Sequence, residues 1–554
     1  MTFLNERSLY KRVCGLCGKA IISLVHPDTP SSVYCPTCWW SDKWDPMDYG
    51  KDIDFSKPFL TQFFELRRSV PEIGRHTMES TMVNSDYCNI CSYLKNCYLV
   101  FNSDYNEECL YGTYLERSKN CSDLYMSDLA EMCYGGSNLF KSYKVQYSNN
   151  CNECINVAFC KNLVGCTDCF GCINLRNKKY YFFNKAYTKE EYAQQVAMFD
   201  LGSFRQVHEL KARVEKFWLQ YPRKHAEGLH NTNVTGDYVF NSKNAFLNYE
   251  TGGCENSKYC QFLFIAPTKD SYDFTMWGGG AERMYECMGA GGGQMDIKFA
   301  YETWSKATNL EYCWYILAQC HNLFGCVGLK NKQYCILNKQ YTADAYESMR
   351  EKVIEHMSAM PYTDALGREY QYGEFFPSEF SLFGYNESLA QTAFPLTKTQ
   401  ARAQGFLWRD PVDNKREITK RAQDLPDHIN NINDGVLEEI IGCAHGGTCM
   451  EQCTVAFKVT PQELAFYRQY YIPLPRLCPN CRHYERLINR NSVSTKFLQR
   501  RCACEGAQSV SGTYSNAAKH RHGVASCAQE FFTSYSPDKP EIVYCEACYN
   551  AEVV

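Results

Sequence analysis

Small and apolar residues recur with a fixed period in the middle of the chain. Between residues 81 and 187, twelve cysteines fall into two columns three residues apart, with spacings of six or multiples of six within each column. One column contains Cys91, Cys97, Cys109, Cys121, Cys133, Cys151 and Cys169, and the other contains Cys88, Cys154, Cys160, Cys166 and Cys172. An inward spacing of three does not fit the alternation of a plain strand, so each repeat must contain a bend.

Asparagine marks the position before the first column. It stands at Asn96, Asn120, Asn138, Asn150, Asn156, Asn162 and Asn174. Asparagine tolerates the left-handed backbone that tight corners need, and its side chain can form hydrogen bonds along a stack. A six-residue unit with a recurring corner and a small inward residue is typical of a β-solenoid, whose coils stack to bury a shared core.

The same pattern occurs a second time. The segment 158–188, with CKNLVGCTDCFGC at its centre, returns at 318–342 with one six-residue unit fewer. The second copy keeps the offset of three, with Cys254, Cys260, Cys320 and Cys326 in one column and Cys287 and Cys335 in the other. The Gly-rich residues 278–293 fit a divergent coil or a surface loop.

A helical pattern follows each solenoid. Thr188 and Glu191 form a capping box for a helix over 189–199, and Thr342 precedes a helix over 343–358. A further helix over 204–219 has apolar residues at helical spacing, namely Val207, Leu210, Val214 and Trp218. We expect these helices to cover the open edges of the sheets.

The cysteine columns allow two interpretations. A ladder of free thiols in the solenoid core is favoured, because free cysteine is among the most buried residue types. The alternative is metal binding, since the pairs Cys88/Cys91, Cys151/Cys154 and Cys169/Cys172 have Cys-x-x-Cys spacing and could hold zinc or an iron–sulfur centre. The six-residue register extends beyond these pairs, which metal binding would not require.

Zinc-ribbon spacing is found at the N-terminal end. Cys14 and Cys17 form one knuckle, and Cys35 and Cys38 form a second knuckle after 17 residues. Four thiolates in this arrangement are typical of a structural zinc ribbon or treble clef, a closed site that leaves no position for a substrate.

The C-terminal end repeats this pattern with one ligand missing. Cys527, Cys545 and Cys548 align with the last three N-terminal ligands, and Val524 takes the position of Cys14. Candidates for the fourth ligand are Cys502, Cys504, His520 and His522. Cys504 is favoured, because a looped insertion could separate it from Cys527.

A third site is expected between these two. Cys449, Cys453, Cys478 and Cys481 have a ribbon-like arrangement, although the first spacing is looser than usual. Cys443 and His445 are spare candidates. The intervening segment predicts a short strand and a helix, with Thr460 and Glu463 as a capping box.

Composition narrows the setting of these sites. The chain has 554 residues, 33 cysteines and a formal net charge of −4, so it is multidomain and has no overall basic field for nucleic acid or membrane. Its start is unlike a signal peptide, and no apolar run is long enough for a membrane helix. We expect a cytoplasmic protein, in which cysteines stay reduced or bind about three structural zinc ions.

The expected fold class is mainly β: two tandem Cys-rich β-solenoid domains of hexad repeats with capping helices, flanked by zinc-ribbon or treble-clef modules. The predicted domains are an N-terminal zinc ribbon (1–45), a linker (46–80), the first solenoid (81–187), capping helices (188–222), the second solenoid (231–341), a capping helix (342–358), an extended arm (359–435), a zinc ribbon (440–490) and a C-terminal zinc ribbon (491–554).

Several motifs together resemble a known family. CPTCWWSDKWDP, GEFFPSEFSLFGYNE, PLPRLCPNCRHYERL and PEIVYCEACYNAEV are similar to segments of a Cys-rich zinc-ribbon and repeat family, largely uncharacterised, of small-genome bacteria and giant viruses. The resemblance covers nearly the whole chain, and residues 449–482 separately resemble a zinc-ribbon domain. Some members are named CaiB/BaiF family proteins. CoA-transferases of that name use an aspartate nucleophile on a different α/β fold, and this sequence has no matching pattern.

Three functional hypotheses follow. The first is a zinc-stabilised, non-catalytic scaffold or binding protein that presents solenoid faces and a basic zinc-ribbon patch to an unknown macromolecule. It is supported by tyrosines outside the ladder at Tyr93, Tyr98, Tyr105, Tyr111 and Tyr125. Such a scaffold would tolerate Arg482→Ala. Neither a membrane nor a small-molecule substrate is expected as its partner.

The second hypothesis is a nucleic-acid-binding zinc protein. Residues 468–521 are rich in Lys and Arg, and the candidate contact residues are Arg476, Arg482, Arg486, Arg490, Lys496, Arg500 and Arg501. The third hypothesis is a metal-dependent or redox enzyme that uses solenoid cysteines. It is the least favoured, because the sequence contains no recognised catalytic motif and no catalytic residue can be assigned.

Overall fold

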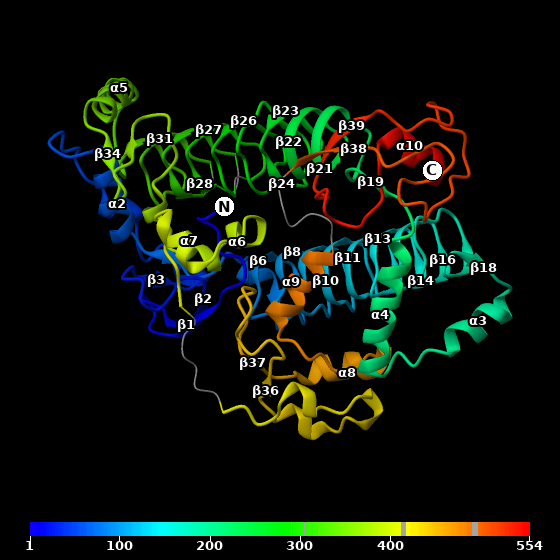
Figure 1. Ribbon diagram of the computed structural model, residues 1–554. Helices are drawn as coiled ribbons and strands as arrows, with labels where there is room; N and C mark the ends of the chain where they lie inside the picture. Colours follow the sequence, from blue (N-terminus) through cyan, green and yellow to red (C-terminus); the bar gives the residue numbers. More distant parts are fainter. Residues whose placement is uncertain (290, 304–305, 318, 411–416, 490–496) are drawn as a thin grey trace. The chain divides into compact units, whose positions relative to one another are not determined.

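Every third residue of the first solenoid has a left-handed backbone. The computed structural model describes residues 1–554 except 290, 304–305, 318, 411–416 and 490–496 (Figure 1). From Ile90 to Phe183, positive φ recurs at each third position without a break, mostly at non-glycine residues. The asparagines expected at corners, such as Asn96 and Asn162, are among them. Because each such residue turns the chain, short three-residue edges replace the usual long strand.

Four of these edges make one coil. Asn89 pairs in parallel with Phe101, which pairs with Thr113, so successive coils are 12 residues apart. The strands are β5 (Met82–Val83), β6 (Asn89–Ser92), β7 (Leu94–Lys95), β8 (Phe101–Asp104), β9 (Thr113–Glu116), β10 (Ser122–Asp128), β11 (Tyr134–Phe140), β12 (Tyr143–Gln146), β13 (Asn149–Asn152), β14 (Ile155–Ala158), β15 (Lys161–Val164), β16 (Thr167–Phe170), β17 (Lys179–Phe182) and β18 (Lys185–Ala186). The predicted β-solenoid is confirmed, with a finer period than the cysteine columns alone indicated.

The second solenoid follows the same plan with longer coils. Glu282 pairs with Met295 and Met295 with Thr308, a spacing of 13 residues. Its strands are β20 (Gly228–Leu229), β21 (Thr232–Phe240), β22 (Lys243–Gly252), β23 (Cys254–Lys258), β24 (Gln261–Leu263), β25 (Thr268–Lys269), β26 (Ala281–Tyr285), β27 (Met295–Lys298), β28 (Tyr301–Thr303), β29 (Thr308–Glu311), β30 (Trp314–Ile316), β31 (His321–Phe324), β32 (Gln333–Ile336) and β33 (Lys339–Gln340). The Gly-rich segment 278–293 contains β26 and is therefore a divergent coil of the sheet.

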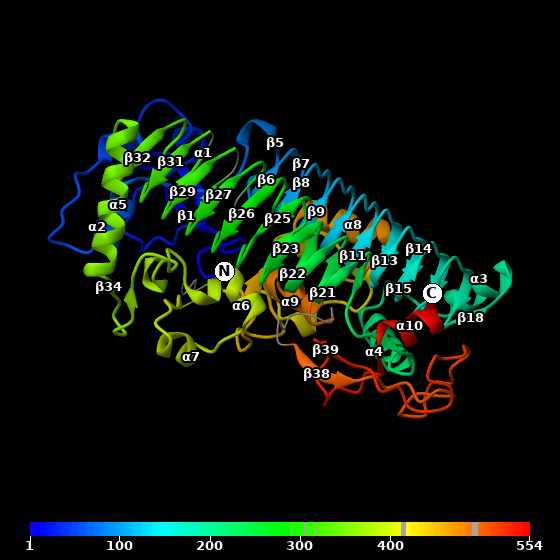
Figure 2. The same cartoon turned by 90° about the horizontal axis from the view of Figure 1, so that it is seen from above.

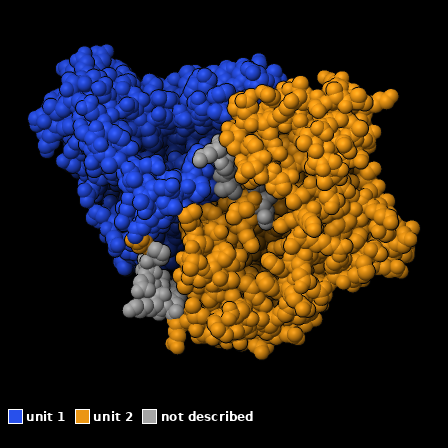
Figure 3. Space-filling model, viewed as in Figure 1, with its two compact units in different colours: residues 1–76, 226–409 blue, residues 77–225, 410–554 orange. Residues whose placement is uncertain are grey.

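The chain forms two compact units that interleave in sequence. Unit 1 comprises residues 1–76 and 226–409, and unit 2 comprises residues 77–225 and 410–554 (Figure 3). Unit 1 contains the second solenoid with the N-terminal ribbon, and unit 2 contains the first solenoid with the other two ribbons. Figure 2 shows the regular strand rows within each solenoid.

Equivalent helices cover an end of each solenoid. In unit 1, Phe59 of α2 (Phe59–Ser69) packs edge-on against Phe324 of β31, with ring centroids 5.1 Å apart. In unit 2, α4 (Phe204–Trp218) buries Val207, Leu210, Val214 and Trp218, as the helical spacing predicted. The capping box of Thr188 and Glu191 begins α3 (Lys189–Ala197), and Thr342 caps α5 (Ala343–Ala359).

Each of these helices leads into a strand that pairs with a ribbon. After α2, β4 (Glu72–Ile73) pairs in parallel with β3 (Val33–Tyr34) of the N-terminal ribbon. After α4, β19 (Arg223–Lys224) pairs in the same way with β40 (Val543–Tyr544) of the C-terminal ribbon. In both cases the chain then crosses to the other unit. The predicted linker 46–80 therefore contains an ordered helix and strand, and the duplication includes a ribbon, a helix and a solenoid.

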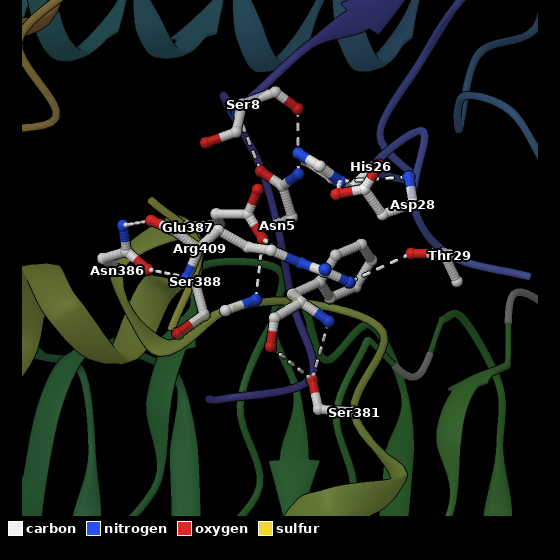
Figure 4. A network of polar contacts seen from close by, with 12 residues as sticks. Asn5, Ser8, His26, Asp28, Thr29, Ser381, Asn386, Glu387, Ser388 and Arg409 are labelled. Carbon is white, nitrogen blue, oxygen red and sulfur yellow. Dashed lines mark hydrogen bonds and ion pairs between the residues drawn. The ribbon is translucent and has the colours of Figure 1, made fainter. Parts of the chain in front are cut away.

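The arm that follows the second solenoid returns to the start of the chain. Residues 359–409 belong to unit 1 and contain β34 (Tyr362–Thr363), β35 (Glu369–Tyr370), α6 (Leu389–Ala393) and α7 (Lys398–Ala403). Ser381 Oγ donates to the Thr2 carbonyl at 2.8 Å, and Arg409 Nη2 donates to Thr29 Oγ1 at 3.1 Å. Buried Glu387 accepts a hydrogen bond from Tyr10 (Figure 4). These contacts fix the N-terminal ribbon within unit 1.

The repeated corner leads to a prediction on stability. Leu129 is an exposed corner residue with φ of 52° in unit 2. Leu129→Val places a β-branched side chain there and should lower the free energy of unfolding by about 1 kcal/mol. Ile155→Val is the matched control, because Ile155 is equally exposed but is not a corner residue. Urea unfolding measures both. Equal effects of the two variants would contradict the assignment of the corner.

Candidate metal centres

Three ribbons share one backbone plan. Each begins with a hairpin, namely β1 (Tyr10–Val13) with β2 (Ala20–Ser23), β36 (Ile441–Gly442) with β37 (Ala456–Phe457), and β38 (Leu498–Arg501) with β39 (Glu530–Thr533). A helix then starts at the second pair of cysteines, in α1 (Pro36–Trp39), α9 (Pro479–Asn489) and α10 (Glu546–Val553). Cysteines in the first turn of a helix meet its positive end, which favours the thiolate.

A shared hydrogen bond identifies the first ligand of each ribbon. The backbone N–H of Cys35 donates to Cys14 Sγ at 3.3 Å. The N–H of Cys478 donates to Cys443 Sγ at 3.3 Å, and the N–H of Cys545 donates to Cys502 Sγ at 3.2 Å. Cys14, Cys443 and Cys502 are therefore equivalent.

The N-terminal group is the simplest. Cys14, Cys17, Cys35 and Cys38 bring their sulfur atoms within 4.8 Å of one another and could hold a metal ion. Burial opposes ionisation of Cys14, but the backbone N–H groups of Cys17, Cys35 and Leu16 lower its pKa to about 6. This cysteine is thus prepared to bind a cation as a thiolate.

The second ribbon gathers Cys443, Cys453, Cys478 and Cys481. Sulfur atoms lie 3.8 Å apart between Cys443 and Cys481 and 4.0 Å apart between Cys453 and Cys478. Two sulfurs bound at 2.3 Å to one tetrahedral ion would be separated by about 3.8 Å. The four thiols therefore fit a tetrahedral metal site.

The C-terminal ribbon gathers Cys502, Cys527, Cys545 and Cys548. The sulfurs of Cys527 and Cys545 are 4.0 Å apart, and the neighbouring thiol of Cys502 lowers the pKa of Cys545 to about 5. The same fit to a tetrahedral ion holds here.

Two ligand positions differ from the sequence prediction. Cys443 takes the place expected for Cys449, and Cys502 takes the place expected for Cys504. Insertions within the first pair of cysteines hid these positions, so Val524, aligned by simple spacing with Cys14, is a loop residue. The small residue after each first cysteine, namely Gly15, Ala444 or Ala503, is a sequence signal that could have revealed the alignment.

The solenoid cysteines are core residues. All twelve in the first solenoid are buried, and no candidate metal group occurs among the described residues of either solenoid. Their thiols connect coils: Cys109 Sγ donates to the Ser118 carbonyl at 3.4 Å, and Cys160 Sγ accepts the N–H of Cys172 at 3.2 Å. Burial raises the pKa of Cys287 to about 12, so this thiol stays protonated.

The predicted basic patch is largely used inside unit 2. Arg482 and Arg486 are each only 6% exposed. Arg476 donates to the carbonyls of Leu425 and Pro426, Arg500 to those of Ser536 and Glu541, and Arg501 to that of Cys527. Arg490 and Lys496 lie outside the described residues.

A buried charge network attaches the second ribbon to the first solenoid. Arg482 lies 3.2 Å from Asp123 Oδ1 and 3.3 Å from Glu463 Oε1, and Arg486 Nη1 donates to Asp123 Oδ1 at 2.6 Å. Tyr111 donates its hydroxyl to Glu463 at 2.6 Å. These arginines are therefore docking residues of the fold.

Comparisons with known proteins add little. No family model and no curated protein matches this sequence. Among solved structures, a putative acetyltransferase from Desulfovibrio desulfuricans G20 matches over 52% of this chain and 84% of that chain, at 9% identity and a TM-score of 0.11. A match this distant carries no argument about function. Within the described residues, no helix is long and apolar enough to cross a membrane.

Cysteine reactivity should separate into two classes. The 33 free cysteines divide into 14 in the ribbons and 19 in the solenoids. Chelation followed by maleimide labelling of the folded protein should modify ribbon cysteines alone, because the others are buried; denaturation should expose the rest. Peptide mass spectrometry measures this. Labelling of solenoid thiols at the ribbon rate without unfolding would contradict the core assignment.

Loss of Arg482 should destabilise unit 2. Arg482→Ala leaves Asp123 and Glu463 buried without their partner, at a cost of about 3 kcal/mol or more. Arg421→Ala is the matched control, because Arg421 is exposed and pairs with Asp424 at the surface; its cost should be below about 0.5 kcal/mol. This reverses the expectation that Arg482→Ala is tolerated. Urea unfolding tests it, and equal costs would contradict the docking role.

Proposed function

We propose that this protein is a zinc-stabilised, non-catalytic scaffold that binds a partner protein along an aromatic ridge on the solenoid of unit 1. The ridge comprises Phe246, Lys258, Tyr259, Tyr272 and Tyr285. Its four aromatic side chains are 38–44% exposed, and this row of unburied rings is the observation that carries the proposal.

The ridge is a product of the solenoid register. Phe246 pairs with Lys258, Lys258 with Tyr272, and Tyr272 with Tyr285, so successive coils place these residues in one column. Tyr259 lies edge-on to Phe246 with ring centroids 5.8 Å apart, and Lys258 Nζ lies 5.5 Å from the centre of the Tyr272 ring. The rings are thus held in place before a partner arrives, which reduces the entropic cost of binding.

The charges beside the ridge favour a protein partner. Lys243, Glu255 and Lys269 form a neighbouring column in which Glu255 lies 3.9 Å and 3.6 Å from the two lysines. A column that neutralises itself offers little attraction to a polyanion. Tyrosine and phenylalanine are enriched at protein–protein interfaces, and stacked repeats commonly provide such extended surfaces.

Zinc is the metal that the ribbon chemistry favours. Four thiolates in tetrahedral arrangement suit zinc, whereas magnesium and calcium prefer oxygen ligands. The ions would link hairpin to helix in each ribbon and hold β3 and β40 against the strands of their units. All 33 cysteines are free, which supports a reducing compartment such as the cytoplasm.

The two alternative functions have weaker support. Nucleic-acid binding relied on arginines of which Arg482 and Arg486 are buried. A redox enzyme relied on solenoid thiols that are also buried. Of the tyrosines singled out in the first solenoid, Tyr111 and Tyr125 are buried, whereas Tyr93 and Tyr105 form an exposed stacked pair with ring centroids 4.5 Å apart.

The ridge can be tested by crosslinking and affinity. A photo-crosslinking amino acid at Tyr272 should capture a protein in cells of the source organism, and the same group at exposed Leu229 of unit 1 should not. With that protein purified, the double variant Tyr272→Ser and Tyr285→Ser should raise the Kd at least about tenfold, as expected for aromatic hot spots. Leu229→Ser should leave the Kd unchanged.

Three outcomes would overturn the proposal. They are equal crosslinking from the two positions, an unchanged Kd in the Tyr272/Tyr285 variant, and a crosslinked species that is RNA rather than protein. Circular dichroism of each variant confirms that the solenoid is intact.

A further inference from the structure

Two of the three ribbons carry an insertion between their first two cysteines. Cys14 and Cys17 are separated by two residues, whereas residues 444–452 separate Cys443 from Cys453 and residues 503–526 separate Cys502 from Cys527. Beyond the insertion the three backbones coincide: Cys14, Cys443 and Cys502 donate their N–H groups to the carbonyls of Lys19, Val455 and Gln529, each two residues after the second cysteine. The insertions are therefore additions to a common framework.

Each insertion supplies a second set of metal-binding side chains. In the C-terminal ribbon, Cys504, His520 and His522 converge on Cys548, which also belongs to the four-sulfur group. In the second ribbon, His445, Cys449 and Glu451 converge on Cys481 in the same way. Cys548 and Cys481 are the last ligands of their ribbons, so the shared cysteine is the same one in both. No second set is found in the N-terminal ribbon, all of which is described.

The histidines of the C-terminal ribbon are oriented for metal binding. His522 Nδ1 lies 2.6 Å from the carbonyl oxygen of Ala525, which places the proton on Nδ1 and leaves Nε2 free, 3.3 Å from Cys548 Sγ. His520 Nε2 contacts Glu552 at 2.9 Å, which leaves Nδ1 as the ligand atom. A carboxylate or carbonyl behind a histidine is the usual support of a metal-bound imidazole.

The fourth ligand of this set is supported as well. Asn516 Nδ2 donates to Cys504 Sγ at 3.3 Å, and Tyr544 holds the Asn516 carbonyl oxygen at 2.8 Å. Glu552 in turn accepts the N–H groups of Ala517 and Ala518 at 2.9 and 3.0 Å. The insertion is thus organised around its donor atoms.

The second ribbon shows atoms that lack another partner. His445 Nδ1 and Glu451 Oε2 are buried atoms 3.0 Å apart that form no hydrogen bond within the described part of the chain. Cys449 Sγ lies 3.7 Å from Cys481 Sγ, close to the separation of about 3.8 Å for two sulfurs on one tetrahedral ion. Gly446 and Gly447, with φ of 56° and 82°, allow the short insertion to turn back onto the ribbon.

We propose that each of these two ribbons holds a pair of zinc ions joined by one cysteine sulfur, Cys481 in one and Cys548 in the other. The inner ion takes the four-sulfur group, and the outer ion takes the donors of the insertion. With zinc–sulfur bonds of 2.3 Å at a tetrahedral angle, the two ions would lie about 3.8 Å apart. The chain would then bind five zinc ions, four of them in unit 2.

Charge balance supports a second ion. Five thiolates close together repel one another strongly when only one divalent ion is bound. With two ions, the C-terminal centre would carry a net charge of −1 and the second-ribbon centre, which adds Glu451, a net charge of −2. These values are no more negative than that of one zinc with four cysteines.

The test is metal content of the full chain and of variants that alter the insertions alone. Elemental analysis should give five zinc per wild-type chain, four for His522→Ala, four for Cys449→Ser, and three for the double variant. Far-UV circular dichroism should stay native, because the inner groups remain complete. His230→Ala is the matched control: this exposed histidine of unit 1 is outside every group, and the variant should keep five.

Cadmium reports the shared sulfur directly. In protein loaded with ¹¹³Cd, a bridging thiolate transmits scalar coupling between the two ions, so two pairs of mutually coupled resonances and one single resonance are expected. Three zinc ions in wild type and in all variants would overturn the proposal. Five cadmium resonances without coupling would also overturn it, because the ions would then not share a sulfur. Neither result depends on the partner of the aromatic ridge.

Discussion

A left-handed backbone at every third residue is the constraint on which both solenoids depend. It shortens each edge of a coil to three residues, so a single side chain per edge points inward. The enclosed space is narrow, and the inward positions of the first solenoid are accordingly filled by Cys, Ser, Ala, Gly, Val, Leu and Asn. Cysteine suits them because it is small and apolar, and its thiol can still donate to a carbonyl of the next coil, as Cys121 does to Ala130.

The ends of such stacks need covering, and the chain achieves this by exchange. α2 and α4 each cover a solenoid of their own unit, pair the following strand with a ribbon, and then continue into the solenoid of the other unit. Neither unit can therefore be cut out as one continuous segment. The ribbons stabilise both the hairpins and these strand pairs, which explains why zinc chemistry accompanies a repeat protein with an ample core.

The periodic features of this structure could be predicted from the sequence, whereas the long-range ones could not. Repeated spacing identified both solenoids, and Thr188 with Glu191 identified a capping box, because these signals are local. The three-residue period was hidden, since Ser103, Asn106 and Gly112 share inward positions with the cysteines. Cys443 and Cys502 were missed as ligands because insertions of unknown length separate them from their partners. The burial of Arg482 depends on Asp123, 359 residues away, and no local pattern reveals such a contact.

Zinc-edge anomalous diffraction from crystals of the full chain tests the central claim most directly, namely that two insertions convert a one-ion ribbon into a two-ion centre. The account predicts one isolated peak at Cys14, Cys17, Cys35 and Cys38 and two close pairs of peaks, each pair about 3.8 Å apart across Cys481 or Cys548. Three isolated peaks, one in each ribbon, would contradict it.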